Sequence, residues 1–223
     1  MITIKNDLNS LKDEIENLLN FEISIENESI TLEGSFNNMQ LITSLKASLM
    51  IMLYNAVEST ITKCLTKIHE RINISHLKYS DLTDSLKKLY LTYYSRAIKK
   101  SNPENEVNFE FQLINLIKDL DDINLSFEMI TKSYNLYSGN LDSKEIMTVL
   151  RRYGLELELK ESSLQTIKKD RNILAHGEKS FEEIGRELSF QQIQDIKDKT
   201  FTYLETFIQE IENYINNNKY KVS

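Results

Sequence analysis

The stretch DRNILAHGEKSFEEIGRE, from Asp170 to Glu187, is the part of the sequence on which the fold prediction depends most. The guanidinium of Arg171 lies on the apolar side of a predicted helix from Ser163 to His176. Such a charge is tolerated when it is paired, when only its stem is buried, or when the apolar side borders a cleft. Gly177 then ends the helix, because glycine readily takes the left-handed conformation after the last turn. The arc of about 100° that carries Arg171 also holds four apolar residues: Leu164, Ile167, Leu174 and Ala175.

The composition of the whole chain favours helices throughout. Of its 223 residues, 40% are hydrophobic and 27% are charged, which is ordinary for a globular domain. One proline and five glycines are far too few for a turn-rich β protein. The sequence therefore predicts an all-α fold in one domain, residues 1–223.

Apolar residues at three- and four-residue steps predict further helices on both sides of this stretch. They cover 6–20, 37–71, a helix marked by Leu82, Leu86, Leu89 and Tyr93, then 109–118, 125–137, 142–152 and a last helix that opens with the capping box Ser189 and Gln192. Pro103 ends the helix that begins near Leu82. Between Phe21 and Leu32 the pattern alternates, which predicts a small β-hairpin or an extended segment. Residues 1–36 would thus form an N-terminal helix with an extended extension, and residues 37–223 the core bundle.

Charge and cysteine content exclude several classes of protein. The net charge of −7 argues against non-specific coating of nucleic acid. From Lys144 to Arg186 the balance is +1, which leaves −8 for the rest, so an anion would be least repelled there. The single cysteine, Cys64, excludes an intrachain disulfide and is expected to be an inert core thiol. No leader or long apolar run is evident, so we expect a cytoplasmic protein without a membrane segment.

Other chemistry-bearing residues give weaker signals. Asp119, Asp121 and Asp122 are adjacent acids, and such acids are usually solvated on a helix surface. His69 and His76 have no partner at i+4, and both are expected at the surface. We therefore expect no metal site and no cofactor.

Structural explanations remain open for the two unusual residues near Gly177. Arg171 could form an ion pair with Glu58 on the long helix of 37–71. His176 could act as a cation at a helix C-terminus, where the dipole favours positive charge. Asn172 and His176, four residues apart, share a face next to that of Arg171, so the three could converge on one groove.

Four segments, taken in order, resemble the HEPN superfamily: YNAVEST (54–60), SGNLDSKEI (138–146), RRYGLE (151–156) and RNILAHGEKSFEEIGRE (171–187). Arg171 and His176 fit its R-x4-6-H signature, with a polar residue directly after the arginine. The resemblance, from about Leu45 to Tyr220, is to bacterial HEPN-like nucleases of toxin and phage-defence loci. It implies an antiparallel helical bundle, a homodimer across the motif helices and metal-independent endoribonuclease activity.

This activity suits the residue types. RNA carries its own nucleophile, the 2′-hydroxyl, so a proton-transfer group and a cation for the crowded phosphate are sufficient. His176 would transfer protons and Arg171 would stabilise the phosphate oxygens, with Asn172 hydrogen-bonding either of them. Glu58 would orient the catalytic residues. Candidate substrate-binding residues are Lys168, Lys169 and Lys179.

The partners expected are an RNA substrate, a second copy of the chain and a cognate antitoxin or defence-system protein. The homodimer would bury the stripe of Leu164, Ile167 and Leu174 near Arg171. The alternative is a non-catalytic HEPN module that binds a nucleotide or a protein. A helical dimerisation domain in which the motif is only structural is a third possibility.

Overall fold

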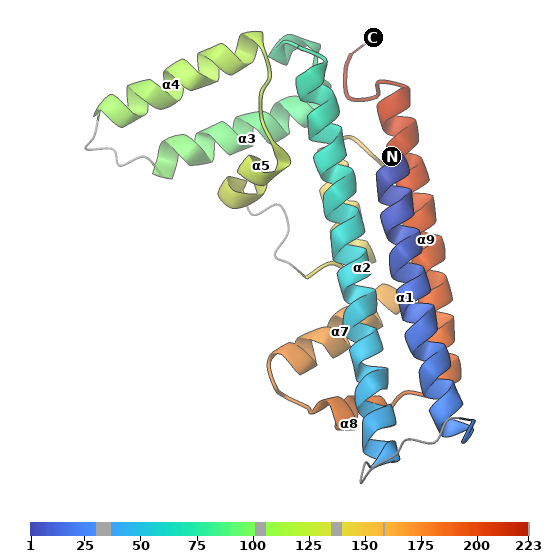
Figure 1. Cartoon of the computed structure of the whole chain (residues 1–223). Coiled ribbons are helices and arrows are strands. Elements are labelled where there is room, and N and C mark those ends of the chain that lie inside the picture. The colour runs from blue at the N-terminus through green and yellow to red at the C-terminus, as the bar shows by residue number, and fades with distance from the viewer. Residues whose placement is uncertain (30–36, 101–105, 135–139, 158, 223) are drawn as a thin grey trace. The chain divides into compact units, whose positions relative to one another are not determined.

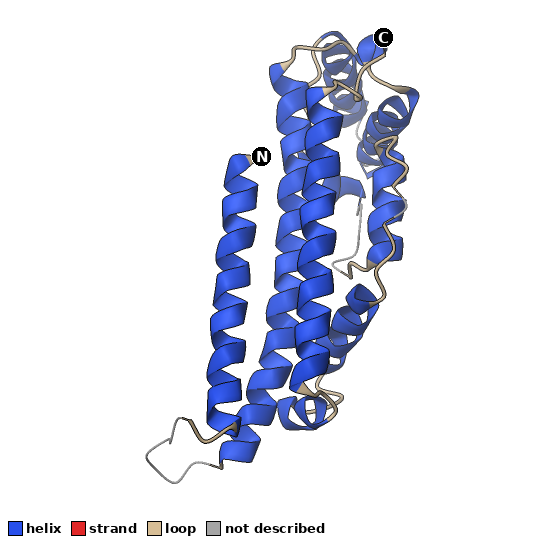
Figure 2. Ribbon diagram, turned by 90° about the vertical axis from the view of Figure 1, so that its right-hand side faces the viewer, coloured by secondary structure: helices blue, strands red, loops and turns tan. Residues whose placement is uncertain are grey.

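The computed structural model describes residues 1–29, 37–100, 106–134, 140–157 and 159–222. Within these ranges the chain is helical and has no β-strand, with one isolated antiparallel bridge between Leu82 and Lys221 (Figures 1 and 2). The all-α prediction is confirmed. The helices are α1 (Ile2–Glu26), α2 (Asn38–Ile74), the 3-10 helix η1 (Tyr79–Asp81), α3 (Asp84–Lys100), α4 (Glu106–Asp121), α5 (Phe127–Tyr134), α6 (Ser143–Arg152), α7 (Ser163–Ala175), α8 (Phe181–Arg186) and α9 (Phe190–Asn216).

The chain divides into two compact units. Unit 1 comprises residues 1–61, 141–143 and 159–208, and unit 2 comprises 62–140, 144–158 and 209–223. Helices α2 and α9 each contribute residues to both units. The predicted terminator Pro103 lies outside the described residues. In the part of the chain that is described, no helix is long and apolar enough to cross a membrane.

Unit 1 is built on α1, which runs antiparallel to α9 and is tied to it by charged side chains. Lys12 Nζ lies 3.3 Å from a carboxylate oxygen of Glu205, and Glu16 pairs with the buried Lys197. Apolar residues of α1 at helical spacing face the core, as the amphipathic pattern predicts. The buried apolar residues of this helix are Ile4, Leu8, Ile15, Leu19 and Ile25.

The prediction of a hairpin beginning at Phe21 is wrong for the residues that the structure describes. Phe21 to Glu26 continue α1, and a turn follows at 27–29. The physical reason is that Glu22 and Ile25 extend the buried stripe of the helix at three-residue steps, which outweighs the alternating pattern. The rest of the predicted hairpin, from residue 30 on, is outside the described residues.

Glu22 is an unexpected ionisable residue in this core. It is fully buried, and neither carboxylate oxygen has a hydrogen-bond partner among the described residues. Burial raises its pKa to about 8, although the nearby Lys46 acts in the opposite direction. The ammonium of Lys46 lies 3.9 Å from the centre of the Phe190 ring, so α1, α2 and α9 meet around two ionisable groups.

Unit 2 contains η1, α3, α4, α5 and most of α6. The expectation that His69 lies at the surface is wrong, because this residue is only 1% exposed. Its ring is enclosed by Tyr90, Phe127 and Tyr153. His76 does lie at the surface, and Cys64 is buried, with a pKa raised by burial to about 12. An un-ionised thiol is unreactive, which agrees with the expected core role.

Candidate active site

The end of α7 is closed by backbone hydrogen bonds. His176 is the C-cap residue, and Gly177 has a left-handed φ of 68°. The N–H of Glu178 donates to the carbonyl of Ile173 at 3.0 Å, and that of Gly177 donates to Leu174 at 3.2 Å, which is a Schellman motif. The helix end predicted from the glycine is thus confirmed.

His176 is exposed at this helix end. Because the backbone of the next two residues already caps the helix, the imidazole is not needed to satisfy its last carbonyls. The ring makes no hydrogen bond or ion pair with any residue in the described ranges, Arg171, Asn172 and Glu58 included. Its ring nitrogens are therefore open to solvent or to a ligand.

The apolar stripe of α7 is packed inside the protomer. Leu164 and Ile167 are each 1% exposed and Leu174 is 9% exposed. The prediction that these three residues form the dimer interface is therefore wrong, because the surface is already covered by the chain itself. Ala175, assigned to the same stripe, is exposed. The residues packed around Leu174 are Ala47, Ile51, Ile173, Ile184 and Leu188.

A short helix that the sequence analysis did not predict, α8, accounts for this coverage. Ser180 and Glu183 form a capping box at its start, a signal that is present in the sequence. Gly185 packs directly against α2: a Cβ atom at this position would lie 1.7 Å from the carbonyl oxygen of Thr43. Only glycine allows this approach, which brings Ile184 onto Ala47 and Leu174.

Arg171 is half-buried at the edge of the stripe. Its guanidinium carbon lies 4.7 Å from the centre of the Tyr54 ring, and Nη1 donates a hydrogen bond of 3.0 Å to Oδ1 of Asn172. Tyr54 is buried on α2, and its hydroxyl accepts a hydrogen bond from the N–H of Leu141 at 3.3 Å. Both partners of the guanidinium are therefore fixed by secondary structure.

The ion pair considered for Arg171 is not formed. Within the described ranges, no carboxylate oxygen of Glu58 lies within 4.0 Å of the guanidinium. Glu58 is half-buried one helical turn after Tyr54, on the same face of α2. Arg171 is thus a half-buried cation with one hydrogen bond, a ring beneath it and no acidic partner in the described chain.

Asp170 is a buried acidic residue next to Arg171 in sequence, and no role was predicted for it. It is 9% exposed and lies on the buried stripe of α7, three residues after Ile167 and four before Leu174. Burial raises the pKa of its carboxyl, with smaller effects from Lys169, which lowers it, and from Glu187, which raises it. Its spacing from Ile167 and Leu174 is the signal in the sequence that places it on this stripe.

The three candidate substrate-binding lysines have different surroundings. Lys168 pairs with Asp142 at 2.8 Å, and Lys179 pairs with Glu187 at 2.5 Å. Lys169 is exposed and forms no ion pair within 4.0 Å in the described ranges. No group of three or more His, Cys, Asp or Glu side chains that could hold a metal ion occurs among the described residues.

The arrangement offers a fixed cation and an accessible proton-transfer group on one helix end. Arg171 has five N–H donors, of which one is used by Asn172, so four are available to an anionic ligand. His176 follows five residues later and is exposed. A phosphate group bound by the guanidinium has the negative charge that such a cation favours.

Comparison with protein families gives one match. A family model described as HEPN_MAE_28990-like HEPN matches residues 2–220, almost the entire chain. Comparisons with curated proteins and with solved structures found no match. The matched range extends the resemblance to the N-terminal helix, which the four sequence segments did not cover.

Proposed function

Since the chain belongs to the MAE_28990-like HEPN family, we propose that it is a metal-independent endoribonuclease that cleaves RNA by attack of the 2′-hydroxyl. The observation that carries the proposal is the state of Arg171. A half-buried guanidinium without an acidic partner in the described chain is costly unless an anion completes its interactions. The phosphate of RNA is such an anion.

The roles follow from the chemistry of each side chain. Arg171 binds two oxygens of the scissile phosphate and stabilises the charge that develops in the pentacovalent transition state. His176 transfers a proton between the 2′-hydroxyl or the leaving 5′-oxygen and solvent. Asn172 and Tyr54 hold the guanidinium in one orientation, so it is ready before substrate binds. They are positioning residues rather than catalytic ones.

Glu58 and the lysines take supporting roles in the proposal. Glu58 lies on the same face of α2 as Tyr54, and in the proposal it orients the catalytic residues when RNA is bound. Lys169 contacts the RNA backbone beside the scissile phosphate, since its ammonium is exposed and not engaged in an ion pair with a described residue. Lys168 and Lys179 already neutralise Asp142 and Glu187, so they contribute less to RNA binding.

We further propose that the protein acts as a toxin or abortive-infection effector, restrained by a cognate partner protein. A homodimer would place two Arg171 and His176 sets in one cleft, but its interface must use a surface other than the covered stripe of α7. Light scattering measures the mass of the particle. Growth arrest on expression, compared between the wild type and His176→Asn, tests the toxicity.

The reaction is tested with a short RNA and its counterpart with one deoxynucleotide at the cut site, each incubated with and without excess EDTA. We expect cleavage in EDTA, a 2′,3′-cyclic phosphate on the product and no cleavage of the deoxy substrate. His176→Asn should lower the rate by about 100-fold or more, because it removes the proton-transfer group.

The matched control is His76→Asn, the same change at an exposed histidine of unit 2. It should cleave at the wild-type rate. Cleavage of the deoxy substrate, or activity that EDTA abolishes and magnesium restores, would contradict the mechanism. Equal rates for His176→Asn and wild type would favour the non-catalytic binding module.

A further inference from the structure

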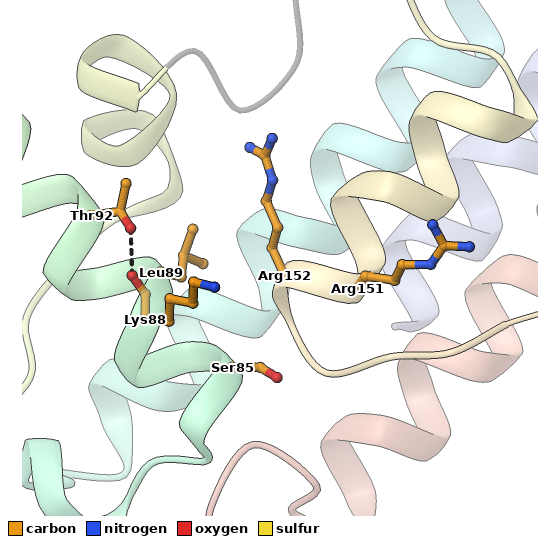
Figure 3. Close-up of a pocket in the computed structure, with 6 residues that line it drawn as sticks. All are labelled: Ser85, Lys88, Leu89, Thr92, Arg151 and Arg152. Carbon is orange, nitrogen blue, oxygen red and sulfur yellow. Dashed lines mark hydrogen bonds between the residues drawn. The ribbon is translucent and has the colours of Figure 1, made fainter.

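Unit 2 contains a pocket that the proposed ribonuclease chemistry does not use. It lies between α3 and α6 and has a volume of about 370 Å³ (Figure 3). This volume falls in the range of small-molecule sites, about 300 to 1,000 Å³. The lining residues are Ser85, Lys88, Leu89 and Thr92 from α3 and Arg151 and Arg152 from α6.

The lining of the pocket is basic. Among the described residues that line it there are three cations and no acidic residue. Lys88 and Arg151 are exposed and form no ion pair with any residue in the described ranges. Figure 3 shows Lys88 and Arg152 on opposite sides of the space between the two helices, and Arg151 extending away from Arg152. The field in this space therefore favours an anion, although the chain as a whole is acidic.

The acid next in sequence to the pocket is already neutralised. Asp84, at the start of α3, lies 3.6 Å from the ammonium of Lys87. The hydroxyl of Thr92 donates to the carbonyl of Lys88 at 2.7 Å, so its proton is not available to a ligand. The hydroxyl of Ser85 has no hydrogen-bond partner within the described chain, and it can donate to an anion.

The two arginines of α6 are not needed to close their helix. Gly154, with a φ of 75°, forms a Schellman motif in which the N–H of Leu155 donates to the carbonyl of Leu150 at 3.0 Å. The N–H of Gly154 likewise donates to the carbonyl of Arg151 at 3.1 Å. A Cβ atom on Gly154 would lie 3.3 Å from Oγ of Ser85, so the glycine also keeps α6 close to α3.

We propose that this pocket binds a small phosphorylated molecule through a terminal phosphate group. A phosphate dianion matches the two positive charges of Lys88 and Arg152 better than a single diester of an RNA strand, which carries one negative charge. The guanidinium of Arg152 and the ammonium of Lys88 take the phosphate oxygens, and Ser85 donates one more hydrogen bond. Leu89, 3% exposed, offers an apolar floor for the organic part.

This site is independent of the proposed ribonuclease function, and its test does not measure cleavage. The full chain is titrated by calorimetry with inorganic phosphate, pyrophosphate, ribose 5-phosphate, ribose, and an RNA oligonucleotide with a 5′-hydroxyl end. We expect one-to-one binding of at least one phosphate compound, weakened by salt, and no binding of ribose. The RNA should bind no differently to wild type and to pocket variants.

Two pocket variants and two matched controls locate the site. Lys88→Gln and Arg152→Gln should each weaken phosphate binding by about tenfold, the effect of losing one charge-assisted hydrogen bond. Lys118→Gln and Arg71→Gln remove the same charges from exposed positions of unit 2 and should bind as wild type does. Ser85→Ala, which removes no charge, should weaken binding by a smaller factor and serves if an arginine variant fails to fold.

Three results would overturn the proposal. The first is no binding of any phosphate compound at millimolar concentration. The second is equal weakening in the controls and the pocket variants, which would mean attraction to net charge only. The third is RNA binding that depends on Lys88 and Arg152 while phosphate binding does not.

Discussion

Arg171 in unit 1 and His69 in unit 2 are both polar side chains set among apolar helix residues, but the protein completes their hydrogen bonds to different extents. His69 is 1% exposed and has a protein partner for each ring nitrogen. Nδ1 lies 3.2 Å from the carbonyl of Leu125, which can only accept, so this nitrogen carries the proton. Nε2 accepts from the hydroxyl of Tyr153 at 2.9 Å.

The difference indicates which of the two groups is free to act on a ligand. Burial lowers the pKa of His69 to about 4, and the neutral ring is held in a closed polar cluster. Arg171 keeps its charge, stacks on Tyr54 and uses one of its donors within the described chain. A group whose hydrogen bonds are complete stabilises the fold, whereas one with spare donors can bind a substrate.

The largest effect should follow from Arg171→Ala. We expect the rate of RNA cleavage to fall by about 100-fold or more, because the charge that stabilises the transition state is lost. The free energy of unfolding should fall by only about 1 kcal/mol, the contribution of a cation–π contact. A gel cleavage assay and chemical denaturation on the same preparation measure both quantities.

Arg186→Ala on α8 is the matched control for this change. Arg186 is exposed and bonded to Glu182 one turn earlier, and its loss should alter neither quantity. If Arg171→Ala unfolds the protein, Arg171 belongs with His69 as a structural group and the comparison fails. If the variant folds and cleaves at the wild-type rate, the site assignment is wrong.

His69→Leu should give the opposite pattern. We expect the free energy of unfolding to fall by about 1 to 3 kcal/mol, because the hydroxyl of Tyr153 loses its partner in a buried place. The cleavage rate per folded molecule should stay within twofold of wild type, which corresponds to a change of about 0.4 kcal/mol in the activation free energy. Urea denaturation followed by circular dichroism measures the stability. A variant as stable as wild type would show that the polar cluster contributes nothing to the fold.

The last comparison is the contribution of His69 to the pH dependence of stability, which Glu22 opposes because its raised pKa makes the folded state bind more protons between about 4.5 and 8. In the unfolded chain the ring takes up a proton near its ordinary value of 6.5, whereas in the folded chain it stays neutral down to about 4. Between these values the unfolded ring binds more protons, so the stability contributed by His69 is complete above pH 6.5 and is lost as the pH falls towards 4. The contribution of His69 to the slope should reach about 1.4 kcal/mol per pH unit.

Urea denaturation at several pH values between 4 and 7 tests this dependence. In His69→Leu the acid-side slope should be smaller by the contribution of one proton, while in Arg171→Ala it should equal that of wild type. Equal slopes in wild type and His69→Leu would mean that the histidine is protonated in the folded protein.

Patterns within one helix predicted the parts of the structure that depend on neighbouring residues. The spacing of apolar residues located α1, α2 and α9, and Gly177 marked the end of α7. The capping box at Ser189 is formed by hydrogen bonds of 2.8 and 3.2 Å with Gln192, as predicted. Ser180 and Glu183 have the same capping-box pattern, but no helix was predicted there, so α8 is absent from the predicted elements.

Contacts between distant segments decided what these patterns left open. His69 was expected at the surface because its own helix offered no partner, but its partners come from Leu125 and Tyr153. Lys168, Lys169 and Lys179 look equivalent in the sequence. Lys168 and Lys179 differ from Lys169 because acidic residues of other segments form ion pairs with them. The apolar stripe of α7 is covered because Gly185 lets α8 pack on α2. A helical wheel of α7 cannot predict this packing between other helices.

The sequence by itself determined that the chain is helical, where most helices begin and end, and which helix end carries Arg171 and His176. These properties depend on residues three or four positions apart, whose effects are largely independent of the rest of the chain. Only the tertiary structure decided that Arg171 stacks on Tyr54 instead of pairing with Glu58. The interactions of a polar side chain depend on which distant groups come within hydrogen-bond reach, and packing fixes that.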